Sequence, residues 1–222
     1  MKVKLISYSK PSQELVDDGL FDIQELIAFC ARVSNPANQL NTDTSDKLIN
    51  YLIKHQHWSP LEMVSACLEI ETTRDIARQM LRHRSFSFQE FSQRYADPTK
   101  DLSFTLREAR LQDSKNRQNS IDIIDHDIQM AWHEIQQEVI DSATNAYNWA
   151  IAHGIAKEQA RVVLPEGNTV SRLYMNGTLR SWIHFIQLRS SNGTQKEHRL
   201  VAHECAKVIA EIFPLANQYI TQ

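Results

Sequence analysis

The chain has 222 residues, of which 42% are hydrophobic and 23% charged, with only 5 glycines and 6 prolines. This composition is typical of a folded globular protein and excludes collagen-like, low-complexity and disordered chains. The length favours one domain that spans residues 1–222. The formal net charge of -3 argues against a protein that binds nucleic acid over its whole surface, so any anion site must be local.

The N-terminal region and the cysteines indicate a cytoplasmic protein. No window approaches about 18 uncharged apolar residues, and polar residues follow the first five, so we expect neither membrane insertion nor secretion. Cys30, Cys67 and Cys205 are odd in number and far apart, which favours a reducing compartment over a disulfide framework. The histidines that lie near one another in the chain lack the spacing of a metal site, so no metal is expected.

The first half of the chain predicts two helices and then a strand. Apolar residues at helical spacing predict helices over residues 21–33 and 48–53. Ser59-Pro60-Leu61-Glu62 fits a capping box, with Ser59 as N-cap of a short helical turn. Strict alternation of apolar and polar residues then predicts a half-buried strand over residues 63–71.

The rest of the chain adds mostly helices. A helix is predicted over 73–84, a loop over 96–99, a strand over 102–110, the longest helix over 121–152, a strand over 169–175, and helices over 179–188 and 201–213. The longest helix carries a single predicted packing stripe, formed by Ile128, Ala131, Trp132, Ile135, Val139, Ala143, Ala146 and Ala150. We therefore expect a helix-rich α+β fold with a small antiparallel sheet flanked by helices, and not a Rossmann fold.

Five arginines gather between residues 74 and 94. On a helix, Arg74, Arg78 and Arg82 would share one face, and their mutual repulsion would be relieved by a bound phosphate. A solvated face paired with nearby Asp75, Glu69 and Glu71 is the alternative interpretation. Aromatic residues interleave with these cations, which also fits a groove for single-stranded nucleic acid: Phe86, Phe88, Phe91 and Tyr95.

One segment carries a specific signature. Arg82-His83-Arg84 is followed, after seven residues, by Ser92, one further residue and Arg94. This pattern resembles that of the flavin-dependent thymidylate synthases. Agreement extends over most of the chain, through Ala31–Ser34, His57–Glu62, Ala160–Pro165 and Arg180–Arg189. Met63 and Gln89 depart from many relatives, which carry His and Asn there, so no contacts are transferred to these two positions.

The resemblance implies deoxyuridine monophosphate (dUMP) as the substrate. The residues implied to bind it are Gln79, Arg82, Glu90, Phe91, Ser92, Gln93, Arg94, Arg161 and Arg189. Arg189 is implied to contact the uracil edge, where a fixed cation would polarise the ring, and it is the expected catalytic residue. Ser92 could suggest a nucleophile, but no Ser-His-acid arrangement is evident, so its hydroxyl is assigned to binding.

The resemblance also implies flavin adenine dinucleotide (FAD), although the chain has no Gly-x-Gly-x-x-Gly loop to hold it. The implied flavin-contacting residues are Ser59, Arg82, His83, Arg84, Glu90, Thr178, Leu179, Arg180 and His184. Ser59 could combine this role with capping, and His184 is either structural or flavin-contacting. NADPH and 5,10-methylenetetrahydrofolate are implied as co-substrates, with a homotetramer whose active sites are shared. No catalytic cysteine is implied, and Cys67 and Cys205 are expected to be buried thiols.

Overall fold

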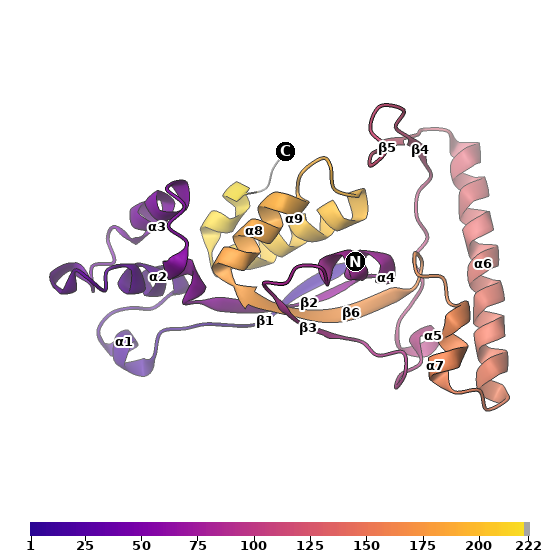
Figure 1. Cartoon of the computed structure of the whole chain (residues 1–222), viewed down its shortest axis with the longest axis horizontal. Helices are drawn as coiled ribbons and strands as arrows, with labels where there is room; N and C mark the ends of the chain where they lie inside the picture. The colour runs from indigo at the N-terminus through magenta and orange to yellow at the C-terminus, as the bar shows by residue number, and fades with distance from the viewer. Residues whose placement is uncertain (220–222) are drawn as a thin grey trace.

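The computed structural model describes residues 1–219. Its main sheet has four antiparallel strands in the order β1-β2-β6-β3, formed by Lys2–Tyr8, Ser65–Thr73, Val170–Thr178 and Ser87–Glu90. Every neighbouring pair is antiparallel. Helices lie over one face of this sheet and at both of its ends (Figure 1), so the expected α+β class is confirmed.

The two central strands follow from alternation in the sequence. Along β2, every second residue from Ala66 to Ile70 is buried, while Ser65, Cys67 and Glu69 lie on the half-exposed face. Cys67 is therefore half-buried rather than packed on the apolar face, which corrects the prediction for this thiol. Strand β6 pairs with β2 over its whole length, from Thr178 opposite Ser65 to Val170 opposite Thr73.

Helices α8 (Leu179–Arg189) and α9 (Lys196–Ala210) cover one face of the sheet (Figure 1). The hydroxyl of Thr178 caps α8 by accepting from the Ser181 backbone N–H. Trp182 and Phe185 of this helix are fully buried in the main core. The Trp182 indole N–H donates to the Ala66 carbonyl at 3.0 Å. The predicted helix over 201–213 is shifted, because α9 begins and ends earlier and a 3-10 helix, η4 (Pro214–Tyr219), follows it.

One end of the sheet carries α1 (Gln13–Asp17), α2 (Ile23–Ala31) and α3 (Ser45–Lys54). Asp22 and Glu25 form a capping box at the start of α2. Both predicted helices in this region are confirmed, with a short 3-10 turn, η1 (Pro36–Asn38), between them.

The other end carries α6 (His126–Ala152), the longest helix of residues 1–219, as predicted (Figure 1). Its C-terminal half forms a second, smaller core, in which Tyr147 and Ala150 pack with Ala160 and Leu164. The predicted packing stripe is only partly right, because Ala143 and Ala150 are buried whereas six of its members are exposed: Ile128, Ala131, Trp132, Ile135, Val139 and Ala146. The buried face of the helix is rotated toward Gln136, Ile140 and Tyr147.

The N-terminal half of α6 is attached through side-chain amides. Gln136 accepts from the Arg107 backbone N–H at 2.9 Å and donates to its carbonyl at 2.8 Å. Gln129 pairs in the same way with Ala109. The predicted strand over 102–110 is wrong for most of its length. A single antiparallel bridge joins Phe104 to Thr169, and beyond it helix side chains satisfy the backbone at Arg107 and Ala109. A hairpin of β4 (Arg110–Gln112) and β5 (Ser120–Asp122) follows it.

The arginine-rich helix is shorter than predicted. Helix α4 spans Arg74–Met80, and turns occupy the chain from Leu81 to Ser85. Short helical segments complete the fold, namely η2 (Ser59–Glu62), α5 (Pro98–Asp101), α7 (Lys157–Ala160) and η3 (Arg161–Val163), and α5 begins inside the predicted loop over 96–99. Among residues 1–219, no helix combines the length and hydropathy needed to span a membrane.

Candidate functional site

The signature segment runs from the end of α4 through β3 to Arg94, and its His83 lies beside the end of α8. The last residue of that helix, Arg189, donates from Nε to the His83 Nε2 atom at 2.9 Å. These two residues are 106 positions apart in the chain, so the fold joins the two parts of the sequence that carry the strongest resemblance. The predicted catalytic arginine therefore lies against the predicted cofactor-binding histidine.

Charge and burial keep His83 neutral. Burial, followed by the positive charges of Arg189, His184 and Arg82, lowers the pKa of His83 from 6.5 to about 4. A neutral imidazole has one acceptor nitrogen, and the Arg189 guanidinium occupies it. His184 is exposed on α8 and contributes to the electrostatic lowering of the His83 pKa. Arg82, His184 and Arg189 therefore lie close enough to His83 to act on its charge, and we call these four residues the His83 group.

The positive charges in the His83 group destabilise one another. Burial and then the charge of Arg82 lower the pKa of the Arg189 guanidinium. Repulsion between two guanidiniums is relieved when an anion or a polarised carbonyl binds between them. The group is therefore suited to bind an electron-rich ligand edge.

A second group of predicted site residues and their neighbours lines a cavity of about 370 Å³. The group consists of Arg74, Arg78, Gln93, Arg161 and Glu166. Arg74 and Arg78 share the Glu166 carboxylate, at 3.4 and 3.3 Å. Gln93 is buried, and its Nε2 atom has no hydrogen-bond partner. A buried amide donor without a partner costs free energy, so a ligand acceptor in this cavity would be stabilised by it.

The pairing of these arginines differs from the sequence-based alternative. Arg74 pairs with Glu166 and with Glu90, 3.6 Å away, and not with Asp75 or Glu69. Arg82 follows the end of α4, so it does not extend the helical face of Arg74 and Arg78. Arg74 and Arg78 therefore belong to the cavity, whereas Arg82 belongs to the His83 group.

The remaining signature residues extend the cavity group. Glu90 accepts from the Ser171 hydroxyl at 2.8 Å. The Phe91 backbone N–H donates to the Arg172 carbonyl at 2.8 Å, which fixes the chain as it leaves β3. Arg94 pairs with Glu158 at 3.3 Å, and the Ser92 hydroxyl accepts from the Arg94 backbone N–H at 3.4 Å. Ser92 therefore helps to shape the loop that presents Arg94.

A third group forms where η2 meets the start of α8. The Glu62 carboxylate accepts from the Thr178 hydroxyl at 2.7 Å and from the Arg180 guanidinium at 2.8 Å. The predicted capping box at Ser59 is wrong, because Trp58 is the N-cap, no side chain caps the turn, and Glu62 is engaged by α8. Ser59 is exposed. Leu179 is fully buried, and its backbone N–H donates to the Val64 carbonyl.

Strand β6 separates the second and third groups. Ser171, the partner of Glu90, lies near one end, and Thr178 lies at the other. Seven residues at a strand's rise per residue place them about 23 Å apart. Within one chain, Glu90 and Thr178, both predicted to contact the cofactor, are therefore not brought together.

Gln79, on α4, lies beside residues that the sequence interpretation missed. Its amide contacts His198 at 3.2 Å and Gln195 at 2.8 Å. Burial, with lesser contributions from Arg189 and His83, lowers the pKa of His198 to about 3. No motif in the sequence marks His198 as a partner of Gln79, and the one signal that could have found Gln195 is its position at the start of a helical pattern. Cys205 is fully buried, as predicted, and burial raises the pKa of its thiol.

Comparison with known proteins identifies the family. Residues 14–215 match the family model described as "Thymidylate synthase complementing protein". The chain is 49% identical to a flavin-dependent thymidylate synthase of Synechocystis, over 96% of each chain. It is 48% identical to a probable flavin-dependent thymidylate synthase of Paramecium bursaria Chlorella virus 1, again over 96% of each.

The chain belongs to the flavin-dependent thymidylate synthase family.

A solved structure shares the fold of this family member. The UMP/dUMP methylase PolB from Streptomyces cacaoi, bound with 5-Br dUMP, superposes with a TM-score of 0.80. The match covers 98% of this chain and 93% of that one at 24% identity. At that identity the likeness supports the fold, and the sequence relatives carry the family assignment.

Proposed function

We propose that this chain catalyses the FAD-dependent reductive methylation of dUMP to dTMP, with 5,10-methylenetetrahydrofolate as carbon donor and NADPH as reductant. The observation that carries the proposal is the hydrogen bond from Arg189 to neutral His83. It joins the family signature to the Arg180–Arg189 stretch, which also agrees with the family, at a half-buried group of cationic residues. The high identity to full-length relatives supports the same reaction.

The cationic residues would hold the nucleotide. Arg94 and Arg161, with Gln79, Arg82 and the segment from Glu90 to Gln93, provide charge-assisted donors for the phosphate and acceptors for the ribose. The unpartnered Nε2 of buried Gln93 is a donor that a bound oxygen would satisfy. In this role Ser92 binds the substrate and does not attack it.

Arg189 would act on the base. A guanidinium at the N3 or O4 edge of uracil stabilises negative charge that develops there, and the planar fork can offer two parallel donors. Because its Nε is already used by His83, the terminal nitrogens remain for the ligand. His83 thereby fixes the plane of the guanidinium.

The residues present fit an anionic dinucleotide. Arg82, Arg84 and Arg180 suit its pyrophosphate, His83 and His184 suit an aromatic ring system, and Ser59, Glu90 and Thr178 offer polar atoms. FAD supplies hydride chemistry that no side chain can supply. The Gly-rich loop of a Rossmann fold is unnecessary when arginines neutralise the phosphates.

The roles proposed above require more than one chain. Ser171, which donates to Glu90, lies about 23 Å along β6 from Thr178, so sites shared between the subunits of a homotetramer account for Glu90 and Thr178 as cofactor ligands. Each subunit would be one domain over residues 1–222, and the reaction would take place in the cytoplasm.

The deciding experiment combines a spectrum with an assay. Purified protein should show oxidised-flavin absorbance, lose it when NADPH is added, and form dTMP when dUMP and the folate are supplied. Colourless protein that also fails to bind added FAD would exclude the proposal. A labelled single-stranded oligonucleotide tests the alternative, because a nucleic-acid groove would shift it with strong salt dependence.

Arg189→Ala serves as the matched variant. It should retain flavin and lose most dTMP formation in a single turnover, and Arg189→Lys should recover little, because a point charge does not reproduce the planar fork. Near-normal dTMP formation by Arg189→Ala would remove Arg189 from the reaction. Ser92→Ala should be milder, since that hydroxyl is assigned to binding.

A further inference from the structure

Glu166 occupies two of the arginines that line the cavity of about 370 Å³. Arg74 and Arg78 both donate to one oxygen of its carboxylate, Oε1, at 3.4 and 3.3 Å. Hydrogen bonds between a cation and a carboxylate usually measure about 2.7 to 2.9 Å, so these two contacts are long. The carboxylate therefore neutralises both guanidiniums and holds neither of them closely.

The same cavity contains donors that Glu166 does not satisfy. Gln93 is only 4% exposed, and its Nε2 atom has no hydrogen-bond partner. The Arg161 guanidinium also lines the cavity, and within residues 1–219 no carboxylate pairs with it. A buried amide donor and an unpaired guanidinium beside two further arginines favour an anion with several oxygens as the ligand.

The Glu166 side chain can leave its arginines without a change in the backbone. It lies in the turn between η3 and β6 and is 52% exposed. The Glu166 carbonyl accepts from the Asp75 backbone N–H at 3.4 Å. The neighbouring Pro165 carbonyl accepts from the backbone N–H and from the hydroxyl of Thr169, at 2.9 and 2.7 Å. The backbone of the turn is thus fixed to α4 and to the start of β6, while the carboxylate is free to rotate into solvent.

We propose that Glu166 is an internal competitor of the nucleotide phosphate, which holds Arg74 and Arg78 in the free protein and releases them when a phosphate enters the cavity. This inference rests on the proposed function, because it takes dUMP as the ligand. A phosphate offers three strong acceptor oxygens to the two guanidiniums and the Gln93 amide, whereas the carboxylate presents a single oxygen to both guanidiniums. Glu166 thereby lowers the affinity for every ligand that carries the phosphate. Because dTMP carries it too, the competition favours release of the product.

The sign of one mutational effect separates this role from a structural one. If Glu166 only held the arginines in place, Glu166→Gln would weaken phosphate binding, because the guanidiniums would lose their orientation. A competitor predicts the opposite, since the neutral amide of Glu166→Gln attracts the arginines less than the carboxylate does. Two half-exposed ion pairs correspond to a gain in affinity of about three- to tenfold.

The test measures, by calorimetry, the dissociation constants of inorganic phosphate, dUMP, dTMP and deoxyuridine for the flavin-loaded protein. Glu166→Gln should bind the first three more tightly by a similar factor. Deoxyuridine lacks the phosphate, so its affinity should not change. Unchanged or weaker binding of phosphate and dUMP by Glu166→Gln would overturn the proposal, and so would an equal gain for deoxyuridine.

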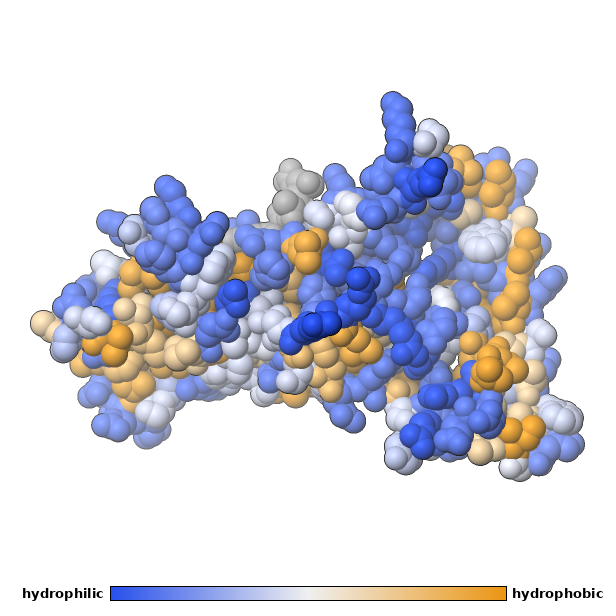
Figure 2. All heavy atoms as spheres, in the orientation of Figure 1, coloured by the Kyte–Doolittle hydropathy of each residue, from blue (hydrophilic) through white to orange (hydrophobic). Residues whose placement is uncertain are grey.

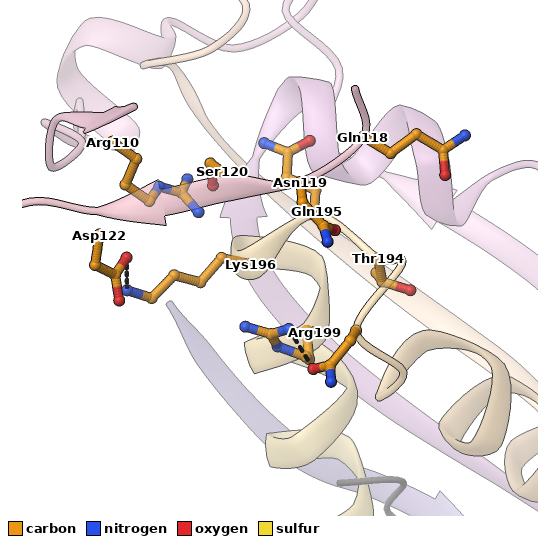
Figure 3. A pocket seen from close by; sticks show the side chains of 10 residues that line it. Arg110, Gln118, Asn119, Ser120, Asp122, Thr194, Gln195, Lys196 and Arg199 are labelled. Carbon is orange, nitrogen blue, oxygen red and sulfur yellow. Dashed lines mark hydrogen bonds and ion pairs between the residues drawn. The ribbon is translucent and has the colours of Figure 1, made fainter. Parts of the chain in front are cut away.

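Glu108→Gln is the matched control. Glu108 also presents one oxygen to two cations, Arg110 at 3.6 Å and Lys196 at 2.7 Å, and its side chain is 45% exposed. Both cations line a separate polar cavity of about 290 Å³ (Figure 3), which shares no lining residue with the first. Glu108→Gln should therefore leave all four dissociation constants unchanged.

A second background tests whether the gain depends on the arginines. In Arg78→Gln protein, one of the two competing ion pairs is already absent, so adding Glu166→Gln should give a smaller gain than in the wild type. A full gain in that background would show that Glu166 acts only through its charge at a distance, which contradicts displacement. Failure of the wild-type protein to bind dUMP would instead refute the proposed function, so the two failures are distinct.

Discussion

His83 and His198 combine burial with nearby positive charge, and this gives the protein a characteristic dependence on pH. The pKa of His83 falls from 6.5 to about 4, and that of His198 to about 3, with burial as the main cause for each. The unfolded chain therefore binds protons at pH values where the folded chain does not. The neutral imidazoles favour folding fully above pH 6.5, and this stability is lost as the pH falls toward 4.

We expect the thermal unfolding midpoint to decrease as the pH is lowered from 6.5 to 5. This range lies above the ordinary pKa values of carboxylates. His83→Gln keeps an acceptor for Arg189 and removes one titrating group, so its midpoint should depend less steeply on pH. His133→Gln, at an exposed position on α6, is the control and should match the wild-type slope. Identical slopes for all three proteins, measured by calorimetry with FAD in excess, would contradict this account.

At the scale of elements, β6 and the signature segment approach so closely that only glycine fits between them. A Cβ added to Gly177 would overlap the Phe86 ring. That ring packs edge-on against Trp182, with centroids 4.8 Å apart, and 6.4 Å from the His83 ring. Gly177 thus allows the sheet, α8 and the signature segment to meet.

Gly177→Ala should displace Phe86 and destabilise the protein by about 1 to 3 kcal/mol, the usual cost of overpacking a core. Flavin retention should fall as well, because His83 moves with its neighbour. Gly167→Ala is a matched control, since an added Cβ there meets nothing within 4 Å. Chemical denaturation gives the stability, and Phe86→Leu in the Gly177→Ala background should restore part of it. Unchanged stability in Gly177→Ala would disprove the close approach.

Elements with strong internal patterns were predictable, and elements defined by distant partners were not. Alternation alone predicts β2, and helical spacing predicts α2, α3 and α8. Strands β1 and β3 are edge strands whose pairing depends on residues far along the chain, so their short patterns gave no signal. The strand predicted over 102–110 is wrong for most of its length because the backbone of Arg107 and Ala109 bonds to Gln136 and Gln129, side chains of a helix that no local pattern reveals.

The site shows the same division. Residues in the signature could be identified because their order and spacing are specific to a family. Gln195 could not, since a glutamine at the start of a helix is common, and its contact with Gln79 joins residues 116 positions apart.

At the scale of the whole molecule, α6 exposes an apolar stripe at the edge of the chain (Figure 2). Its members recur at intervals of four and three residues, as in helices that pair with other helices: Ile128, Trp132, Ile135 and Val139, which are 41 to 52% exposed. The proposed homotetramer offers a second copy of the chain as the occupant of this face. Assembly would then bury the stripe.

Trp132→Glu should therefore disrupt assembly, because a carboxylate in the apolar stripe cannot be buried without a partner. Light scattering should show four-chain particles for the wild type and smaller species, down to the 25.7 kDa chain, for the variant. Turnover should fall with assembly, since shared sites need several chains. Asn145→Glu places the same charge on α6 outside the stripe and should remain tetrameric. A fully tetrameric, active Trp132→Glu would exclude α6 from the interface.

The 23 Å that β6 places between Ser171 and Thr178 restricts how the gene can change in length. One inserted residue would turn every following side chain to the opposite face of the sheet, sending Met175 toward solvent and Asn176 into the core. Two inserted residues would keep the faces but move the groups at the two ends of the strand about 7 Å further apart. Insertions and deletions should therefore be tolerated in the β4–β5 hairpin and selected against in β6. A library of single-codon insertions, scored for thymidine-independent growth, would measure this difference directly.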